Sequence, residues 1–163
     1  MFDVLEGQRR VFLKHRVLFV CVQNAGRSQM AEAFARILGS DVLEASSAGT
    51  RPGRNVNPIV AEVMKERGID ISGNTPRLLT EQLVRDADVI ITMGCSIEEA
   101  CPAPILKRSI DWSLEDPKGK RIEEVRQIRD QIERNVIDLI RSLRSSTGVA
   151  GVVHDKRTLT SES

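Results

Sequence analysis

Short apolar runs and amphipathic segments alternate along most of this chain. Residues 17–22, with the sequence VLFVCV, form a continuous apolar run, which is typical of a parallel-sheet strand covered on both faces. In residues 28–38 the apolar positions recur at helical spacing, and Gly39 follows as a common helix end. The pattern therefore predicts a strand, a short loop and a helix in this order.

The alternation continues toward the end of the chain. Three further strands are predicted at residues 42–49, 88–93 and 106–112, of which the last has the weakest pattern. Helices are predicted at residues 58–67 and 80–85, and a long amphipathic helix has apolar positions from Ile122 to Leu143. This order predicts an α/β fold: a four-stranded parallel sheet with helices on both faces, wound as in flavodoxin.

The pattern divides the chain into three parts. Residues 17–144 contain all the predicted strands and helices and are expected to form one α/β domain. Residues 1–16 mix polar and apolar positions and form an N-terminal extension of unknown role. Residues 145–163 are rich in Ser, Thr and Gly, which predicts a disordered C-terminal tail.

Composition and charge exclude several classes of protein. The 163 residues include 24 Lys and Arg and 23 Asp and Glu, for a net charge of +1. Nucleic acids and anionic membrane surfaces require a concentrated positive field, so neither is expected as a partner. No stretch reaches the roughly 18 apolar residues that a membrane span needs. Three cysteines are an odd number and too few for a disulfide-stapled secreted protein, which predicts a cytoplasmic location.

The segment between the first predicted strand and helix carries candidate chemistry. Cys21 lies near the strand end, Arg27 follows at C-x5-R spacing, and Ser28 opens the helix. Such a loop points backbone N–H groups inward at the positive end of a helix dipole, where they bind a tetrahedral oxyanion and stabilise a thiolate. Arg27 adds a planar fork for two anion oxygens. The predicted oxyanion-binding residues are Val22, Gln23, Asn24, Ala25, Gly26, Arg27 and Ser28.

Simpler interpretations of these residues also exist. Cys21 could be a buried strand residue, Ser28 a helix cap and Arg27 a surface charge. The Ser28 hydroxyl suits donation to a thiolate, however, and Asn24 suits a left-handed turn, while Gly26 allows a close approach of the backbone to an anion. A nucleotide-binding P-loop would need glycine in place of Cys21 and lysine in place of Arg27, so two residues argue against that alternative.

The loop resembles the low-molecular-weight protein tyrosine phosphatase superfamily, and more closely its arsenate reductase branch. In RSQMAE, Gln29 stands where the phosphatases usually have proline, as in the reductases. Gly26 occupies the position of a second cysteine that the phosphatases usually have, and SAGT (Ser47–Thr50) is similar to another shared segment. The resemblance covers about residues 17–144. It implies that these residues form a catalytic domain with the fold of this superfamily.

The resemblance also implies a general acid. The superfamily carries an Asp-Pro pair just before its last helix, and Asp116-Pro117 matches it by position. Proline restricts the residue before it and helps to hold an extended loop, although Asp, Pro and Gly are also common turn residues. The phosphatases commonly place aromatic residues after this pair, at the entrance for phosphotyrosine. This chain has Lys118 there and no tyrosine, which weakens a phosphatase assignment.

Cys95 and Cys101 follow the third predicted strand. Ligands bind outside the carboxyl ends of parallel strands, so both cysteines are expected on the same rim as Cys21 and Asp116. The spacing argues against zinc, and a permanent disulfide is not expected in the cytosol. In a helix, residues six positions apart are separated by about 9 Å, so a disulfide between them would require unwinding. The alternative is that both are packing residues.

The thioredoxin-coupled arsenate reductases use three cysteines in this arrangement, and the resemblance implies the same relay here. Cys21 would attack arsenate with the help of Asp116, Cys95 would then form a disulfide with Cys21, and Cys101 would take over that disulfide. The implied partners are arsenate, with phosphate and sulfate as competing anions, and a thioredoxin-like protein as external thiol reductant. No metal and no tightly bound cofactor are expected.

Two other functions compete with arsenate reduction. A phosphatase that hydrolyses phosphate monoesters through a cysteinyl-phosphate would use Cys21, Arg27 and Asp116 and ignore the other cysteines. A non-catalytic anion or redox sensor is the second alternative. Asp116 counts against the sensor, because a pure binding module has no need of a general acid. Arsenate reduction is therefore the leading hypothesis.

Overall fold

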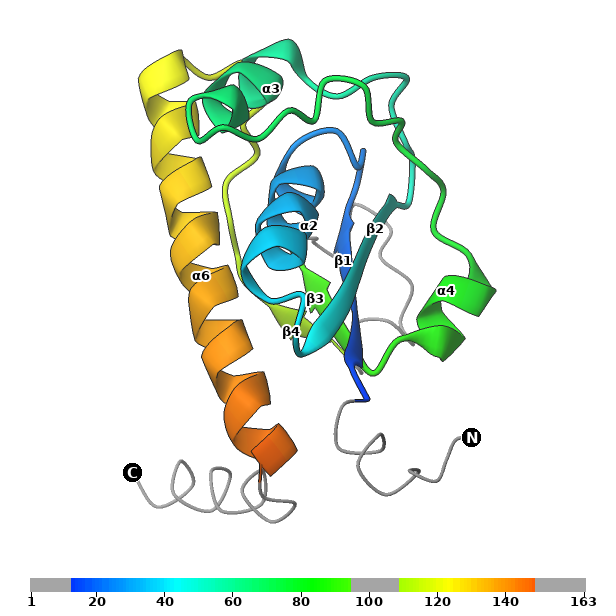
Figure 1. The fold of residues 1–163 in the computed structure, drawn as a ribbon. Coiled ribbons are helices and arrows are strands. Elements are labelled where there is room, and N and C mark those ends of the chain that lie inside the picture. Colours follow the sequence, from blue (N-terminus) through cyan, green and yellow to red (C-terminus); the bar gives the residue numbers. More distant parts are fainter. Residues whose placement is uncertain (1–12, 95–108, 149–163) are drawn as a thin grey trace.

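A parallel sheet of four strands forms the centre of the molecule (Figure 1). The computed structural model describes residues 13–94 and 109–148. The strands are β1 (His15–Cys21), β2 (Leu43–Gly49), β3 (Val89–Thr92) and β4 (Ile110–Asp111). They lie in the order β2-β1-β3-β4, and each neighbouring pair is parallel. Because β1 occupies an inner position, the loop that follows it opens at the middle of the carboxyl edge.

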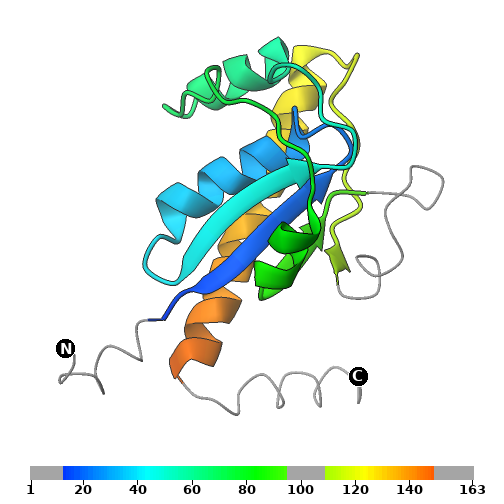
Figure 2. The ribbon, with the colours of Figure 1, turned by 90° about the vertical axis from the view of Figure 1, so that its right-hand side faces the viewer.

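The alternation of side chains along β1 gives the sheet two apolar faces. Val17, Phe19 and Cys21 pack into the larger core, which α2, α3 and α6 cover. Leu18 and Val20 point to the opposite face and join a smaller core that includes residues of α4. Figure 2 shows α2 and α6 on one side of the strands and α4 on the other. The predicted fold class is confirmed.

Local sequence explains where several helices begin. Within the described ranges the helices are α2 (Arg27–Leu38), α3 (Pro58–Lys65), α4 (Glu81–Asp86) and α6 (Ile122–Gly148). Asn57 Oδ1 accepts a hydrogen bond from the N–H of Ile59 over 2.9 Å, and proline occupies the first position of α3. Thr80 Oγ1 accepts one from the N–H of Leu83 over 3.2 Å and caps α4.

The element boundaries differ from the sequence pattern mainly near the chain ends. β1 begins at His15, inside the predicted extension, because the N–H of His15 donates to Val42 O over 2.9 Å. α6 continues to Gly148, past the boundary predicted at residue 144. The division into an extension, a catalytic domain and a tail stays a prediction. Residues 1–12, 95–108 and 149–163 lie outside the described residues, and with them part of the predicted strand 106–112.

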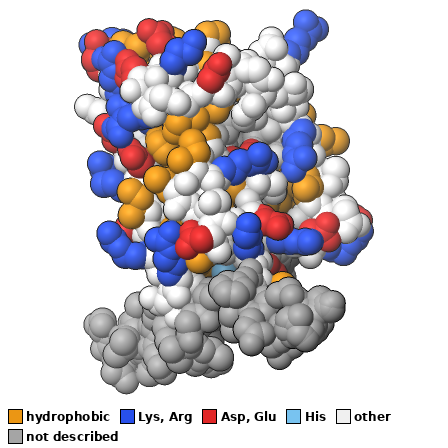
Figure 3. Space-filling model, viewed as in Figure 1, with side chains coloured by type: hydrophobic (Ala, Val, Ile, Leu, Met, Phe, Trp, Pro, Cys, Tyr) orange, Lys and Arg blue, Asp and Glu red, His pale blue; other side chains and the backbone are white. Residues whose placement is uncertain are grey.

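Charged side chains connect the end of α3 to α6. Arg126 and Arg129 contact the carboxylate of Glu66 with N–O distances of 2.8 and 2.7 Å. The hydrogen bonds from Arg126, and secondly from Arg129, lower the pKa of Glu66 to about 2. Figure 3 shows acidic and basic side chains intermixed over the surface on this side of the molecule. The long last helix is thus attached by charges at its edge as well as by its apolar face.

Candidate active site

Cys21 is the last residue of β1, and its free thiol is buried. Ser28 Oγ lies 2.9 Å from Cys21 Sγ, and the backbone N–H of Asn24 donates to the same sulfur over 3.2 Å. Asn24 has a φ of +52°, the left-handed conformation that the sequence predicts. Gly26 precedes α2 as its N-cap, so the interpretation of Ser28 as a simple helix cap is wrong.

A chain of hydrogen bonds connects the Ser28 hydroxyl to Glu32 through Asn24 and Ser47. The Glu32 carboxylate accepts hydrogen bonds only, so the Ser47 hydroxyl in contact with it is the donor. Asn24 Nδ2 donates to Ser47 Oγ over 2.9 Å and to Ser28 Oγ over 2.7 Å. Ser28 Oγ accepts from Asn24, and toward a Cys21 thiolate, which can only accept, the Ser28 hydroxyl is the donor. One O–H and one N–H therefore converge on the sulfur.

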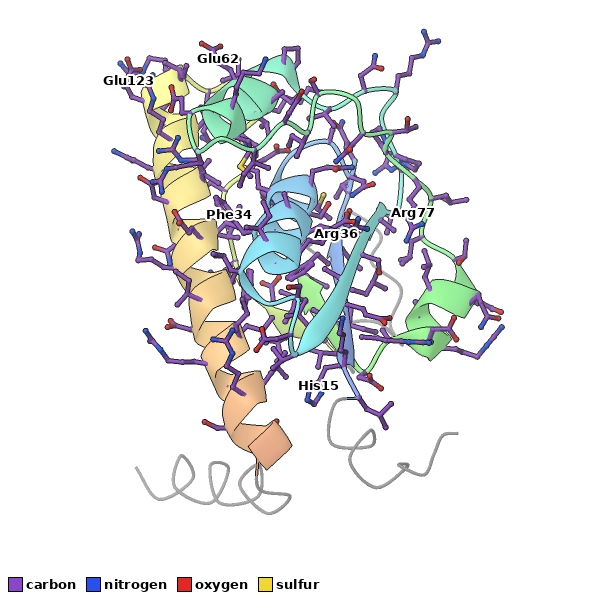
Figure 4. The ribbon with its side chains drawn as sticks, in the orientation of Figure 1. His15, Phe34, Arg36, Glu62, Arg77 and Glu123 are labelled. Carbon is purple, nitrogen blue, oxygen red and sulfur yellow. The ribbon has the colours of Figure 1, made fainter. Side chains whose placement is uncertain are left out.

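Residues outside the loop fix the other end of the Asn24 amide. The N–H of Arg77 donates to Asn24 Oδ1 over 2.9 Å, and Arg77 Nε donates to Ser47 O over 3.0 Å. Figure 4 shows Arg77 beside the end of β2. Gln29 Nε2 donates to Asn24 O, and Gln29 Oε1 accepts from Asn74 Nδ2, both over 3.1 Å. The segment before α4 thus supports the loop that carries the nucleophile.

Arg27 joins three segments beneath the site. It is the first residue of α2 and is buried, and its Nη1 donates to Leu114 O over 2.9 Å and to Met93 O. Gly94 has a φ of +86°, and a Cβ there would lie 2.7 Å from Leu114 O and 3.3 Å from Arg27 Nη1. Only glycine therefore allows the turn after β3 to approach the arginine so closely.

Asp116 enters the site from the segment between β4 and α6. Its Oδ2 lies 3.8 Å from Arg27 Nη2, and its side chain is 58% exposed where that of Arg27 is 8% exposed. Asp116 Oδ1 accepts the N–H of Lys118 over 3.0 Å. Pro117 is buried, and a Cβ at Gly26 would lie 2.9 Å from Pro117 Cγ. Glycine at position 26 therefore allows this turn to lie directly against the loop.

These groups line one small cavity with a volume of about 30 Å³. Its lining residues are Cys21, Gln23, Ala25, Gly26, Arg27, Asn57, Asp116, Pro117 and Lys118. A larger cavity of about 390 Å³ is lined by Asn24, Glu32, Ser47 and Arg77 among others, but not by Cys21. The smaller cavity therefore holds the candidate chemistry: a thiol, a guanidinium and a carboxyl group around a space suited to a small anion.

Asp111, at the end of β4, has a role that the sequence analysis missed. Its Oδ1 accepts from Thr92 Oγ1 and from the N–H of Gly94, both over 2.7 Å, and its Oδ2 accepts from Ser113 Oγ over 2.8 Å. Burial raises the pKa of Asp111, but these hydrogen bonds outweigh it and the pKa is lowered. Asp111 thereby fixes the Gly94 turn. Many strand-end aspartates look alike in a sequence, so no signal singled it out.

The sequence predicts five candidate catalytic residues. The structure brings three of them together in one cavity: Cys21, Arg27 and Asp116. Cys95 and Cys101 lie outside the described residues, and their relay stays a prediction. Among residues 13–94 and 109–148, no three or more His, Cys, Asp or Glu side chains are placed to hold a metal ion. In the same ranges no helix is long and apolar enough to cross a membrane.

The sequence matches the family described as low molecular weight phosphotyrosine protein phosphatase over residues 16–148. The chain belongs to this family. A putative arsenate reductase of Halobacterium salinarum is 46% identical over 126 residues, which are 74% of this chain and 87% of that protein. A glutaredoxin arsenate reductase of Synechocystis sp. is 40% identical over 128 residues, 77% of this chain and 95% of that protein. The resemblance to the arsenate reductase branch of the family is thus confirmed.

Solved structures with the same fold include arsenate reductases. One of them is an arsenate reductase in the phosphate binding state, with a TM-score of 0.71 and 37% sequence identity. The match covers 79% of this chain and 98% of that chain. A thioredoxin-dependent arsenate reductase of Corynebacterium glutamicum has a TM-score of 0.67 and 38% identity, covering 82% of this chain and 63% of its own. Family membership therefore rests on both the sequence and the fold.

Proposed function

We propose that this protein is an arsenate reductase in which the Cys21 thiolate attacks arsenate. The observation that carries the proposal is the small cavity where Cys21 Sγ lies beside Arg27 and Asp116. Loop residues 23 and 25–27 line this cavity at the start of α2, where backbone N–H groups and the helix dipole favour an oxyanion. The arsenate reductases among the relatives support arsenate as the substrate, with phosphate and sulfate as competing anions.

In the first step, a bond forms between the Cys21 sulfur and arsenic, and one arsenate oxygen leaves as water. Asp116 supplies a proton to this leaving oxygen. Since Arg27 Nη1 is taken by two backbone carbonyls, its Nε and Nη2 are the donors for two anion oxygens. The product is a thiol ester in which arsenic is still pentavalent.

In the second step, Cys95 attacks the Cys21 sulfur. The sulfur–arsenic bond breaks and its electron pair stays on arsenic, which leaves as trivalent arsenite, while a Cys21–Cys95 disulfide forms. Cys101 then attacks Cys95, which frees the Cys21 thiolate and leaves a Cys95–Cys101 disulfide. The chain reaches Cys95 directly from Gly94, which lies against Arg27, and this connection supports the relay.

An external dithiol supplies the two electrons that close the cycle. Three cysteines in one chain favour a thioredoxin-like protein, because the last disulfide then lies away from the nucleophile. One similar structure is thioredoxin-dependent, whereas one relative is a glutaredoxin arsenate reductase. The proposal is therefore a cytoplasmic enzyme with no tightly bound cofactor, reduced by a thioredoxin-like partner.

Phosphatase activity is the second candidate function. Cys21, Arg27 and Asp116 suffice to form and release a cysteinyl-phosphate, and all three lie in the one cavity. Phosphorus in such an intermediate does not accept the electron pair, so Cys95 and Cys101 would have no role. Hydrolysis of p-nitrophenyl phosphate is therefore the reaction to compare with arsenate reduction.

The test is NADPH oxidation through thioredoxin and thioredoxin reductase with the purified full chain. We expect NADPH consumption only when arsenate is added, and none with Cys21→Ser. Cys101→Ser should release one arsenite per chain but stop multiple turnover. Rapid p-nitrophenyl phosphate hydrolysis without arsenate-dependent turnover would show a phosphatase instead, and unchanged steady-state reduction by Cys101→Ser would exclude that cysteine from the relay.

A further inference from the structure

The cavity around Cys21 contains four ionisable groups, of which the proposed reaction uses three. Cys21 and Asp116 carry negative charge when ionised, and Arg27 carries one positive charge. When Asp116 is protonated, as the general acid of the proposed first step, the Cys21 thiolate and Arg27 cancel and these three groups give the cavity no net charge to attract a dianion. Lys118 is the fourth ionisable lining residue, and its ammonium makes the net charge positive.

Among the described residues, the Lys118 ammonium has no ion-pair partner that would keep it from a ligand. In the part of the chain that the structure describes, no carboxylate lies within ion-pair distance of it. Lys120, two residues further on, differs in this respect because its Nζ lies 3.5 Å from Glu115 Oε1. Part of the Arg27 guanidinium already has partners, since Nη1 donates to two backbone carbonyls and Nη2 lies 3.8 Å from Asp116 Oδ2.

The backbone holds Lys118 at the cavity. Its N–H donates to Asp116 Oδ1 over 3.0 Å, and the intervening Pro117 is buried against Gly26. The start of the side chain is therefore fixed relative to both Asp116 and the oxyanion loop, while the ammonium remains on an exposed, flexible stem. This combination suits the capture of an anion better than a structural role.

We propose that Lys118 is an oxyanion-capturing residue that makes this site prefer tetrahedral dianions over monoanions of the same shape. The inference rests on the proposed function, because it assigns the cavity to an oxyanion. A point charge on a flexible stem strengthens entry and binding of the anion without taking part in bond formation. Its removal should therefore raise KM for arsenate and leave kcat nearly unchanged.

The test compares Lys118→Gln with Lys120→Gln as matched control and Lys118→Arg as conservative variant. Sulfate and perchlorate, tetrahedral anions of charge −2 and −1, serve as probes. Each bound anion protects Cys21 against alkylation by iodoacetamide, and the alkylated fraction is measured by peptide mass spectrometry. The dependence of this protection on anion concentration gives the dissociation constant. For a charge about 6 Å from the anion, we expect Lys118→Gln to weaken sulfate binding about tenfold and perchlorate binding about threefold. At about 0.5 M salt the sulfate loss should shrink to about twofold and the perchlorate loss to about 1.4-fold.

Lys120→Gln and Lys118→Arg should bind both anions as the natural protein does. Equal sulfate affinity in Lys118→Gln and the natural protein would overturn the inference, as would equal losses for the two anions or the same loss in Lys120→Gln. If the natural protein binds sulfate but never reduces arsenate, the proposed function fails, while the larger sulfate loss in Lys118→Gln still supports the role of Lys118. If the natural protein binds neither anion, both fail.

Discussion

Asn24 shows how one side chain organises the candidate active site. Its Nδ2 donates to the hydroxyls of Ser28 and Ser47, and its Oδ1 accepts the N–H of Arg77. With both ends of the amide bound to fixed partners, the group has one favourable orientation, and the position of the Ser28 hydroxyl beside Cys21 depends on it. The sequence indicated a left-handed turn at Asn24 but could not reveal these long-range partners.

Ser28→Ala tests this network at its contact with the nucleophile. The substitution removes the O–H that is directed at Cys21 Sγ. A hydrogen bond to a charged group stabilises by about 1.5–3 kcal/mol, so we expect alkylation of Cys21 by iodoacetamide at neutral pH to slow about tenfold or more. Ser72→Ala is the control, because the Ser72 hydroxyl donates to Asp70 in an exposed turn. Equal alkylation rates in Ser28→Ala and the natural protein would show that the hydroxyl does not stabilise the thiolate.

Gly26 has an importance beyond the approach of the backbone to an anion that the sequence predicts. A side chain at this position would meet Pro117 Cγ at 2.9 Å, so glycine serves the approach of the Asp116 turn. We expect Gly26→Ala to displace Asp116 by a few tenths of an ångström and to lower kcat for arsenate by about tenfold. Gly73→Ala is the control, since a Cβ there meets nothing within 4 Å.

The measurement is steady-state turnover, together with thermal unfolding to show that both glycine variants remain folded. An unchanged kcat in Gly26→Ala would contradict a close fit between the Asp116 turn and the oxyanion loop. A similar loss in Gly73→Ala would indicate a general effect of replacing loop glycines.

At the scale of elements, Gly39 shows where a correct sequence signal had a different physical cause. The sequence predicts it as the stop of the helix at residues 28–38, and α2 does end at Leu38. Its φ of −127° is open to any residue, however, so the backbone does not require glycine here. A Cβ would lie 2.8 Å from the side chain of Ile140, which identifies the close contact of α2 with α6 as the reason.

The charge contacts between α3 and α6 predict a pH dependence of stability. The pKa of Glu66 is lowered from 4.5 to about 2 by Arg126 and Arg129. A group whose pKa is lower in the folded state adds stability above its unfolded pKa, and this contribution is lost as the pH falls through the folded pKa. The contribution of Glu66 should therefore be full at neutral pH and disappear between about pH 4.5 and about pH 2.

Urea unfolding of Glu66→Gln and the natural protein across this range is the measurement. The difference in the free energy of unfolding should be largest at neutral pH and close to zero at the acid end. A double-mutant cycle with Arg126→Gln separates the direct contact from other effects of the substitution. A difference that stays constant with pH would exclude ionisation of Glu66 as its source.

At the scale of the whole molecule, the parallel sheet explains how distant residues meet. The oxyanion loop follows β1, the Gly94 turn follows β3, and Asp116 follows β4, so all three lie at the carboxyl edge of the sheet. The sequence could predict this convergence because strand order and direction follow from alternating strands and helices. The contacts that refine it, such as Arg27 with Met93 and Leu114, depend on side-chain packing between distant segments and carry no local signal.

The central claim is that this chain reduces arsenate with its own thiols. The most direct measurement mixes the fully reduced protein with arsenate in the absence of any external reductant, and then counts arsenite and free thiols. We predict one arsenite per chain and the loss of two of the three thiols, with neither change in Cys21→Ser. Three remaining thiols and no arsenite, after reaction of a protein that still binds phosphate, would contradict the claim.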